Sequence, residues 1–363
     1  MTNTQAVALA PRGLSAELLD RLSPSDEKAC ADFVRSAASG CYLQWPEWPT
    51  MARDNGRYIH RYLICRSSAA IVALAVVRLS RLPLNRGIAV VRRGPVTRSL
   101  ADLEWALPAI LDALQRAGAC TVVVNPRWEG ADASAALAIL RTGGGEPLPP
   151  DMQSLHTTTG YVDLTVSEER ILGAFKQRGR RQLRKSTENG LMIREAVSLD
   201  EAMAYEPILR DFHASRGLSI DAVPTAADQW RLTRSGGVFL LSYLNGELVG
   251  GHVAIRDGYR AFWLSMASRD IDPAIPKNYV LVWEAMRRMK ARGCAVYDMA
   301  GMPDPRRVEQ AGLGKVEANR SQFKFAFSPQ LVELTPMTAF AVRPLAHAIL
   351  FSARQAYRQR RSR

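Results

Sequence analysis

The chain has 363 residues, of which 47% are hydrophobic and 23% charged, so a wholly disordered chain is excluded and we expect two domains with a substantial core. Its 48 Lys and Arg residues outnumber 35 Asp and Glu residues, and the net charge of +13 suits a polyanionic partner such as RNA or an anionic membrane surface. A proteome rich in arginine would produce the same excess, so the positions of the charges must decide between these interpretations.

The first half of the chain has the alternating pattern of an α/β domain. We expect residues 1–13 to form a loose leader, and the Ser23 hydroxyl can cap a helix that starts after it. The pattern then predicts, in chain order, two strands within residues 60–78 joined at Ser67-Ser68, a strand at 87–91, a helix over 100–117 and a buried strand at 120–124. The Gly and Pro residues of 142–150 predict a surface connection.

The second half repeats this order more fully. Ser167 with its two following glutamates marks a helix start, and Asn245-Gly246 is a strong signal for a two-residue hairpin. The predicted elements are a strand at 160–164, a helix from 167, a strand at 191–194, a helix over 200–216, strands at 238–244, 248–256 and 259–268, a helix over 279–292 and a strand at 295–299. Each half therefore predicts a helix, a hairpin of strands, a helix and a strand, as in a duplicated unit.

This order predicts an α/β fold with mixed (α+β) sheets in three segments. We expect a first domain over residues 14–150, a second over 151–335 and a C-terminal amphipathic, basic helix over 336–363. The N-terminus lacks the basic and apolar regions of a signal peptide, and the longest apolar run, 69–77, is too short to span a bilayer. The expected location is the cytoplasm.

The sequence lacks the usual signatures of nucleophilic, nucleotide-binding and metal chemistry. No G-x-S-x-G, Walker A or G-x-G-x-x-G motif is present, and the five histidines have no ligand spacing. The five cysteines are odd in number, widely spaced and without any C-x-x-C pair. We therefore expect no metal site, no disulfide framework and no cofactor.

The most concentrated charge lies in the segment KQRGRRQLRK, residues 176–185, where six of ten residues are basic and none is acidic. Such a run is usually a solvated helix face. Six like charges within three turns also repel one another, and an anionic ligand would relieve that repulsion. We expect the phosphates of an RNA to contact the cations of this segment, which include Lys176, Arg180, Arg181, Arg184 and Lys185.

The C-terminal segment combines an apolar side with a run of arginines. Pro344 suits the first turn of a helix whose apolar side would comprise Phe340, Val342, Leu345, Ala348, Ile349 and Phe351. Five arginines follow within residues 354–363. We expect the apolar part to pack on the globular body and the arginines to add affinity for RNA. An unstructured solubilising tail and weak contact with a membrane surface are the alternatives.

Seven short motifs are spread over residues 40–335. They are a Q-x-P-x-W opening in residues 42–48, R-G-P-V at 93–96, the strand 120–126, ILGAFKQRGRRQLRKSTENGL at 171–191, N-G-E at 245–247 with Gly251, W-E-A at 283–285 with Tyr297-Asp298, and F-K-F at 323–325 continuing to Leu334. In order and spacing these motifs resemble those of the FemAB (FemX-like) aminoacyltransferases.

This family resemblance implies two tandem GNAT-type domains with a cleft between them. It also implies transfer of an amino acid from the 3′ end of an aminoacyl-tRNA to an amine, a reaction that needs alignment and oxyanion stabilisation but no protein nucleophile. Lys324 matches a family lysine that supplies positive charge near the tRNA end, so it is the catalytic candidate; the alternative is a surface lysine on an edge strand. Phe323 is either core or a stacking surface for the terminal base.

The same resemblance supplies candidate substrate-binding residues, with departures from the family pattern. The candidates are Arg53, Asn125, Arg127, Ser265, Tyr279 and Tyr297. Arg53 is the nearest basic residue to a family lysine that follows the early tryptophan, Asn125 replaces a strand-end aspartate, and Ser265 stands where FemX has a tyrosine. These departures argue against a UDP-MurNAc-pentapeptide acceptor.

We therefore predict an aminoacyl-tRNA-dependent transferase that forms an amide on a non-standard acceptor. A small metabolite is the first expectation for that acceptor, and a lipid- or sugar-linked amine is the second. The alternative is an N-acyltransferase of the same fold with an acyl-CoA or acyl-carrier-protein donor, although the nearest fragment to the usual pyrophosphate loop, residues 310–314, has the wrong spacing. A non-catalytic RNA- or membrane-binding module is the second alternative.

Overall fold

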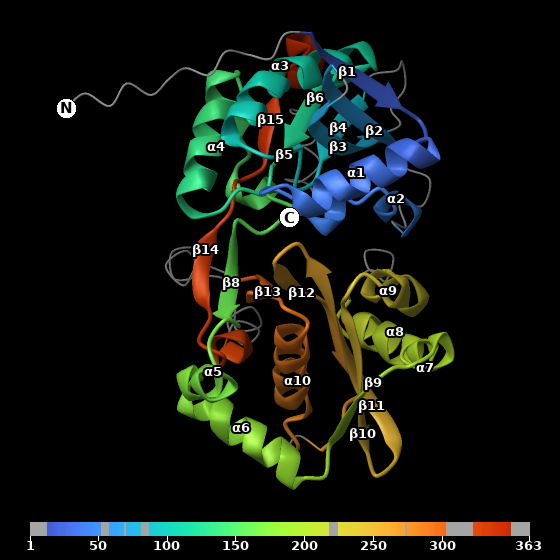
Figure 1. Ribbon diagram of the computed structural model, residues 1–363, viewed down its shortest axis with the longest axis vertical. Coiled ribbons are helices and arrows are strands. Elements are labelled where there is room, and N and C mark those ends of the chain that lie inside the picture. The colour runs from blue at the N-terminus through green and yellow to red at the C-terminus, as the bar shows by residue number, and fades with distance from the viewer. Residues whose placement is uncertain are drawn as a thin grey trace, which may run out of the picture. The chain divides into compact units, whose positions relative to one another are not determined.

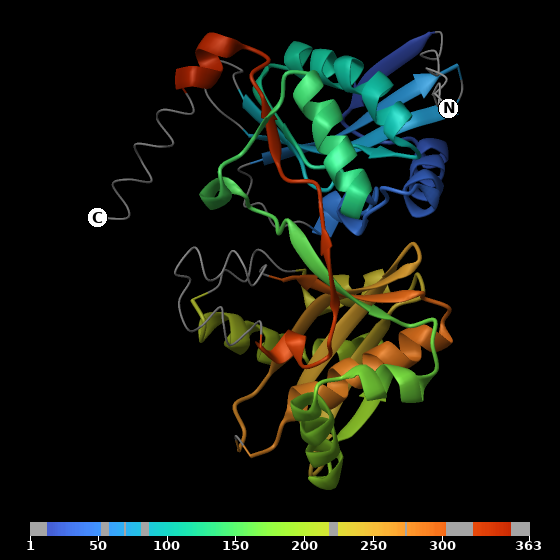
Figure 2. The same ribbon diagram turned by 90° about the vertical axis from the view of Figure 1, so that its left-hand side faces the viewer.

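The chain folds into two compact units, each built around one mixed β-sheet (Figures 1 and 2). The computed structural model describes residues 13–51, 58–68, 70–80, 87–217, 224–272, 274–302 and 322–349. Of these, unit 1 holds residues 13–50, 58–157 and 334–349, and unit 2 holds Met51 and the described part of 158–333.

The sheet of unit 1 has the strand order β1-β2-β3-β4-β6-β15-β7, with β5 paired to β3. Its strands are β1 (Leu14–Leu19), β2 (Tyr58–Ser67), β3 (Ala70–Ser80), β4 (Gly87–Val91), β5 (Val96–Thr97), β6 (Ala119–Val124), β7 (Glu146–Pro147) and β15 (Thr338–Phe340). Only the β4–β6 pair is parallel among these strands. A parallel neighbour requires a crossover, and the helix between β4 and β6 supplies it.

The helices before residue 158 are α1 (Pro24–Ser36), α2 (Trp48–Met51), α3 (Leu100–Arg116) and α4 (Gly130–Thr142), with single 3-10 turns at Tyr42–Gln44 and Pro150–Met152. Ser23 caps α1, as its sequence position predicted, and Ser99 forms a capping box with Asp102 at the start of α3. The apolar stripe of α3, which includes Leu107, Ile110 and Leu114, packs on the sheet and forms the core of unit 1.

The sheet of unit 2 has the strand order β14-β8-β13-β12-β11-β10-β9, with a single parallel pair, β12–β13, among its strands. Its strands are β8 (Thr158–Asp163), β9 (Met192–Glu195), β10 (Val238–Leu244), β11 (Glu247–Asp257), β12 (Arg260–Ser268), β13 (Val296–Gly301) and β14 (Gln330–Glu333). The predicted Asn245-Gly246 turn joins β10 to β11, and both residues have positive φ, as such a turn requires.

Helices cover both faces of this second sheet (Figure 1). They are α5 (Glu168–Ala174), α6 (Gln177–Glu188), α7 (Leu199–Met203), α8 (Glu206–Ala214), α9 (Ala226–Thr233) and α10 (Lys277–Ala291). Because side chains alternate along a strand, Leu240 packs in one cluster with Met286 of α10, whereas Phe239 contacts Tyr205 and Trp230 on the opposite face. None of the helices in the described parts is long and apolar enough to cross a membrane.

The predicted α/β fold with mixed sheets is confirmed, and the differences are local. The helix predicted from Ser167 is two helices, because Phe175 and Lys176 are extended and Phe175 turns into the core. The helix predicted over 200–216 is also split, with Pro207 in the first turn of α8. The sequence reading missed α4, whose buried face is mostly alanine, and the short elements β1, α9 and β15.

The C-terminal segment differs from its prediction. Phe340 is not on a helix: it lies in β15, which pairs with β6 and buries the side chain in the core of unit 1. A helix does begin at Pro344, as predicted, but Leu345 is 85% and Ile349 is 67% exposed, so the expected packing of its apolar side on the body is wrong for these residues. Phe351 and the arginines of 354–363 lie outside the described residues.

The buried Gln44 joins the 3-10 turn Tyr42–Gln44 to the sheet of unit 1. The Gln44 Nε2 donates to Arg92 O at 2.6 Å, and its Oε1 accepts from Val76 N at 2.6 Å. We expect Gln44→Leu to lower the free energy of unfolding by about 2–4 kcal/mol, because it leaves two main-chain groups unpaired. Urea unfolding measures this, and Gln115→Leu, which removes one exposed bond to Val342 O, is the control with an expected cost below about 1 kcal/mol.

Candidate active site

The parallel strands β12 and β13 of unit 2 diverge soon after they begin. Their pairing covers Arg260↔Val296, Ala261↔Tyr297 and Phe262↔Asp298. Further along, β12 continues beside β11 to Ser268, whereas β13 bends at Ala300, which has a φ of 58°, and pairs with β8 across an irregularity. The divergence leaves main-chain carbonyl groups of β13 facing an opening in the sheet instead of a neighbouring strand.

Lys324 fills this opening. It lies on a helical turn over residues 322–325, and its Nζ donates to Met299 O at 2.6 Å and to Gly301 O at 2.9 Å. The same Nζ lies 5.2 Å from the centroid of the Trp263 ring. Lys324 is therefore a half-buried cation fixed by two carbonyl dipoles and an aromatic face, and the edge-strand alternative for this residue is wrong.

A buried, neutral histidine lies beneath the same tryptophan. The His252 ring centroid is 4.7 Å from that of Trp263, its Nδ1 is 2.8 Å from Ser265 O, and its Nε2 contacts the Tyr297 hydroxyl. Since a carbonyl can only accept, Nδ1 carries the proton and Tyr297 donates to Nε2. Burial lowers the pKa of His252 from 6.5 to about 4, and the nearby Lys324 charge acts in the same direction. Burial also raises the pKa of Tyr297 well above 10.

The other candidates of unit 2 surround this centre. Phe323 is half-buried and packs against Trp263 at 6.2 Å and Tyr279 at 4.8 Å between ring centroids. The Ser265 hydroxyl donates to Gln229 of α9, so this side chain lies on the face of the sheet that is opposite α10. The structure thus brings together the predicted residues Lys324, Phe323, Tyr279 and Tyr297, whereas Ser265 reaches this group only through its main-chain carbonyl, which contacts His252. Their substrate-binding roles remain predictions.

Sequence reasoning missed His252 and Trp263, which connect these side chains. A lone histidine within an apolar strand has no spacing that separates a buried polar group from a catalytic one. The only sequence signal was its place in β11, next to the N-G-E motif. Its contacts come from β12 and β13, which only the sheet brings alongside.

The basic run forms α6, and its cations are exposed as expected. Arg181 and Arg184 lie opposite the buried Gly179 and Leu183. Arg180 has a structural task as well, because its guanidinium donates to Gly173 O at 3.0 Å and to Phe175 O, at the end of α5. Lys176 and Lys185 are exposed at either end of the basic face, and the Lys176 Nζ lies 5.7 Å from the Phe325 ring.

The candidates of unit 1 take part in local contacts after β6. Asn125 is 1% exposed, and its Oδ1 accepts from Arg93 N at 2.9 Å. Arg127 is 3% exposed and forms an ion pair with Glu129. These bonds hold the backbone where the strand ends, and a role toward substrate remains a prediction for both residues. Arg53 lies outside the described residues.

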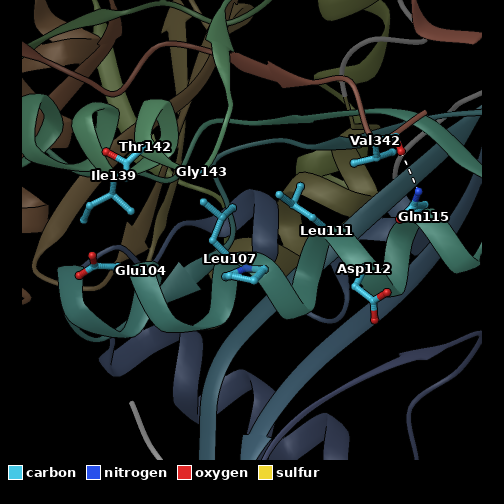
Figure 3. Close-up of a pocket in the computed structure, with 10 residues that line it drawn as sticks. Glu104, Leu107, Leu111, Asp112, Gln115, Ile139, Thr142, Gly143 and Val342 are labelled. Carbon is cyan, nitrogen blue, oxygen red and sulfur yellow. Dashed lines mark hydrogen bonds between the residues drawn. The ribbon is translucent and has the colours of Figure 1, made fainter. Parts of the chain in front are cut away.

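Unit 1 also carries a groove of about 460 Å³ between α3 and α4 (Figure 3). Leu107, Leu111, Ile139 and Val342 form its apolar surface, and the carboxylates of Glu104 and Asp112 lie along it. Negative carboxylates do not stabilise an oxyanion, and polar groups do not converge there as they do around Lys324. The candidate for chemistry is therefore the opening in unit 2.

Known proteins are similar to this chain in one segment of its sequence and in its fold. Residues 173–306 match the family model of an acetyltransferase (GNAT) domain. The solved structure of FemX is similar over 92% of this chain and 99% of its own, with a TM-score of 0.74 at 15% identity. The C-terminal domain of a protein named as a lysylphosphatidylglycerol synthetase from Agrobacterium fabrum covers 91% of this chain and 96% of its own, with a TM-score of 0.57 at 14% identity. L-PGS from Bacillus licheniformis covers 90% and 94%, with a TM-score of 0.56 at 14% identity.

No curated protein sequence matches the chain. At these identities the structural likeness concerns the fold, and the predicted tandem GNAT-type α/β fold of the FemX kind is confirmed. The matched GNAT domain contains His252, Trp263 and the β12–β13 opening. Phe323 and Lys324 lie beyond the end of the matched residues.

The buried neutral His252 predicts a pH-dependent stability. Its folded pKa is about 4 against 6.5 in the exposed state, so the unfolded chain binds the proton first as pH falls. We expect the free energy of unfolding to be fully retained above pH 6.5 and to fall by about 3 kcal/mol as pH decreases to 4. Denaturant unfolding across this range measures the loss, which His252→Gln should remove and His347→Gln, as the control, should not. An equal pH dependence in wild type and His252→Gln would contradict the assignment.

Proposed function

We propose that this protein is an aminoacyltransferase that moves an aminoacyl group from an aminoacyl-tRNA to the amine of an acceptor. The observation that carries the proposal is the Lys324 ammonium, held in the β12–β13 opening by Met299 O and Gly301 O. The exposed cations of α6 lie on the helix that packs against the same turn, through Lys176 N and Ala326 O at 3.0 Å. A fixed positive charge beside a polyanion-binding surface suits a charged-tRNA donor.

The chemistry requires little from the protein beyond positioning and charge. The neutral amine attacks the ester carbonyl, the C–N bond forms, and the C–O bond to the ribose breaks as the proton passes to the leaving hydroxyl. Negative charge develops on the carbonyl oxygen in between, and a half-buried ammonium stabilises it more strongly than one in water would. Lys324 supplies this charge, and the neutral state of His252 avoids a second, repelling cation beneath it.

The donor assignment rests on the basic face of α6. Arg181, Arg184 and Lys185 are exposed and point away from the body of unit 2. Phosphate contacts of this kind position a nucleic acid without reading its sequence. The half-buried Phe323 offers an aromatic surface beside Lys324, which suits stacking of a terminal base.

The acceptor is not the UDP-MurNAc-pentapeptide. It is an amine of a small metabolite or of a lipid- or sugar-linked molecule. One structural neighbour is named for lysylphosphatidylglycerol, an aminoacylated lipid. This name favours aminoacyl transfer and is compatible with a lipid-linked acceptor.

The second candidate function is N-acyl transfer from an acyl-CoA or acyl-carrier donor. The acetyltransferase name of the matched domain favours it. The fragment 310–314, which has the wrong spacing for a pyrophosphate loop, lies outside the described residues.

One experiment separates these functions. The protein is incubated with a full set of charged tRNAs, with and without RNase, and the release of each amino acid is followed. Loss of one amino acid that depends on intact tRNA supports the proposal. Thermal stabilisation by acyl-CoA, without any turnover of charged tRNA, favours the second function, and no turnover with any donor favours a non-catalytic binding module.

Removal of the Lys324 charge should act on turnover rather than on folding. We expect Lys324→Met to lower kcat by about 10²–10³, the typical effect of one lost oxyanion donor. The matched control is Lys290→Met, which removes another lysine whose Nζ donates to a main-chain carbonyl, Leu164 O at 2.7 Å, and should leave kcat near wild type. Wild-type turnover in a folded Lys324→Met protein would exclude this lysine from the mechanism.

Removal of the α6 charges should act on donor binding. We expect the triple variant Arg181→Ala/Arg184→Ala/Lys185→Ala to weaken tRNA binding and to reduce the slope of log K against log salt by roughly one unit for each lost contact. Arg180 is left unchanged because its guanidinium donates to Gly173 O and Phe175 O at the end of α5. The control removes three exposed arginines elsewhere, Arg116, Arg141 and Arg234, and should keep the wild-type slope. The same salt slope in both variants would exclude α6 as the tRNA surface.

A further inference from the structure

The basic helix and the lysine turn meet at one main-chain carbonyl, Ala326 O. The N–H of Lys176, the N-cap residue of α6, donates to this oxygen at 3.0 Å. A Cβ on Gly179 would lie 2.5 Å from the same oxygen and 3.4 Å from Ala326 Cβ. No side chain fits at the first of these distances, so α6 approaches the turn this closely only because residue 179 is glycine.

The position of Ala326 is linked rigidly to that of Lys324. The turn closes through two short-range bonds, Ala326 N to Phe323 O at 3.2 Å and Phe327 N to Lys324 O at 3.1 Å. Phe327 is buried and packs against Phe175, the residue that ends α5. A displaced Ala326 carbonyl would therefore move the backbone of Lys324, whose Nζ has to reach Met299 O and Gly301 O.

The conformation of Gly179 gives no other reason for a glycine. It lies in the third position of α6 with helical backbone, and glycine is a poor helix former compared with alanine. Gly173 in α5 provides the contrast, because a Cβ there would meet nothing within 4 Å. The two glycines thus differ in what a methyl group would contact, although both lie on short helices beside the same core.

We propose that Gly179 is a positioning residue: its missing side chain lets α6 rest on the Ala326 carbonyl and thereby sets Lys324 in the β12–β13 opening. The spacing between the polyanion-binding face of α6 and the Lys324 ammonium is fixed through this contact. This inference rests on the proposed function, in which both parts serve one donor.

The first test compares Gly179→Ala with Gly173→Ala. We expect Gly179→Ala to lower kcat by about 10–100-fold, since an error of about 1 Å in the position of a catalytic group has that scale of effect. Its Kd for tRNA and the salt slope should stay at wild-type values, because no charge is lost. Gly173→Ala should keep both parameters. Equal kcat in the two alanine variants would overturn the proposal, as would a loss of tRNA affinity in Gly179→Ala that accounts for all of its lost activity.

A second readout needs no turnover. The Trp263 ring lies 5.2 Å from Lys324 Nζ and 6.2 Å from the Phe323 ring, so its environment reports the position of the turn. In protein labelled with 5-fluorotryptophan, with the Trp263 resonance assigned by Trp263→Phe, Gly179→Ala should shift that ¹⁹F signal and Gly173→Ala should not. An unshifted Trp263 signal in Gly179→Ala would overturn the inference. Wild-type protein without turnover on any charged tRNA would instead reject the proposed function, and the ¹⁹F comparison would still decide the role of Gly179.

A second pair of variants tests the same contact if the Gly179→Ala protein does not fold. Lys176→Pro removes the N–H that binds Ala326 O, and the backbone there suits proline, with φ −58° at Lys176 and ψ 146° at Phe175. Lys176→Ala is its control, because it removes the same charge but keeps the N–H. We expect Lys176→Pro to shift the Trp263 signal and lower kcat relative to Lys176→Ala. Identical behaviour of the two variants would overturn the coupling between α6 and the lysine turn.

Discussion

The site depends on how a cation is held partly out of water. Removing an ammonium group from water is costly unless other dipoles replace the lost hydration. In unit 2 the divergence of β12 from β13 frees the carbonyls of Met299 and Gly301, and these two oxygens with the Trp263 face receive the Lys324 charge. The location of the charge therefore follows from the sheet itself: without the divergence, these carbonyls would not face an opening.

The same cation accounts for the polar layer beneath it. His252 is fully buried next to a positive charge, so the imidazole is kept neutral and acts as a hydrogen-bonding spacer between Ser265 O and the Tyr297 hydroxyl. A neutral spacer adds no repulsion to Lys324 and holds Trp263 in place. The electrostatic requirement and the packing requirement are thus met by one side chain.

The two units differ at their parallel strand pairs. In unit 1, β4 and β6 pair at five residue pairs from Gly87↔Ala119 to Val91↔Val124, with one register shift after Gly87, and the Asn125 Oδ1 accepts from Arg93 N where β6 ends. In unit 2 the corresponding parallel pairing covers three residue pairs before the strands part. A ladder that reaches the ends of its strands satisfies the carbonyls there, whereas one that stops early leaves them for a side chain or a ligand. This contrast places the candidate chemistry in unit 2, where the acetyltransferase-type domain matches.

The sequence by itself determined most of the local elements, the α/β class and the charge of α6, but it missed α4, whose buried face is mostly alanine, and several short elements. Helix caps, two-residue turns and the alternation of apolar residues act over a few positions, as at Ser23 and Asn245-Gly246. Adjacent residues are therefore enough to predict them. The sequence also pointed to Lys324 and Phe323 through their motif. Only the tertiary structure decided that His252 lies under Trp263, that Phe340 is a strand residue and that Gly179 meets Ala326 O, because each of these contacts joins segments far apart in the chain. Such contacts depend on side-chain packing and on the burial of polar groups. The spacing of residues along the sequence does not predict them.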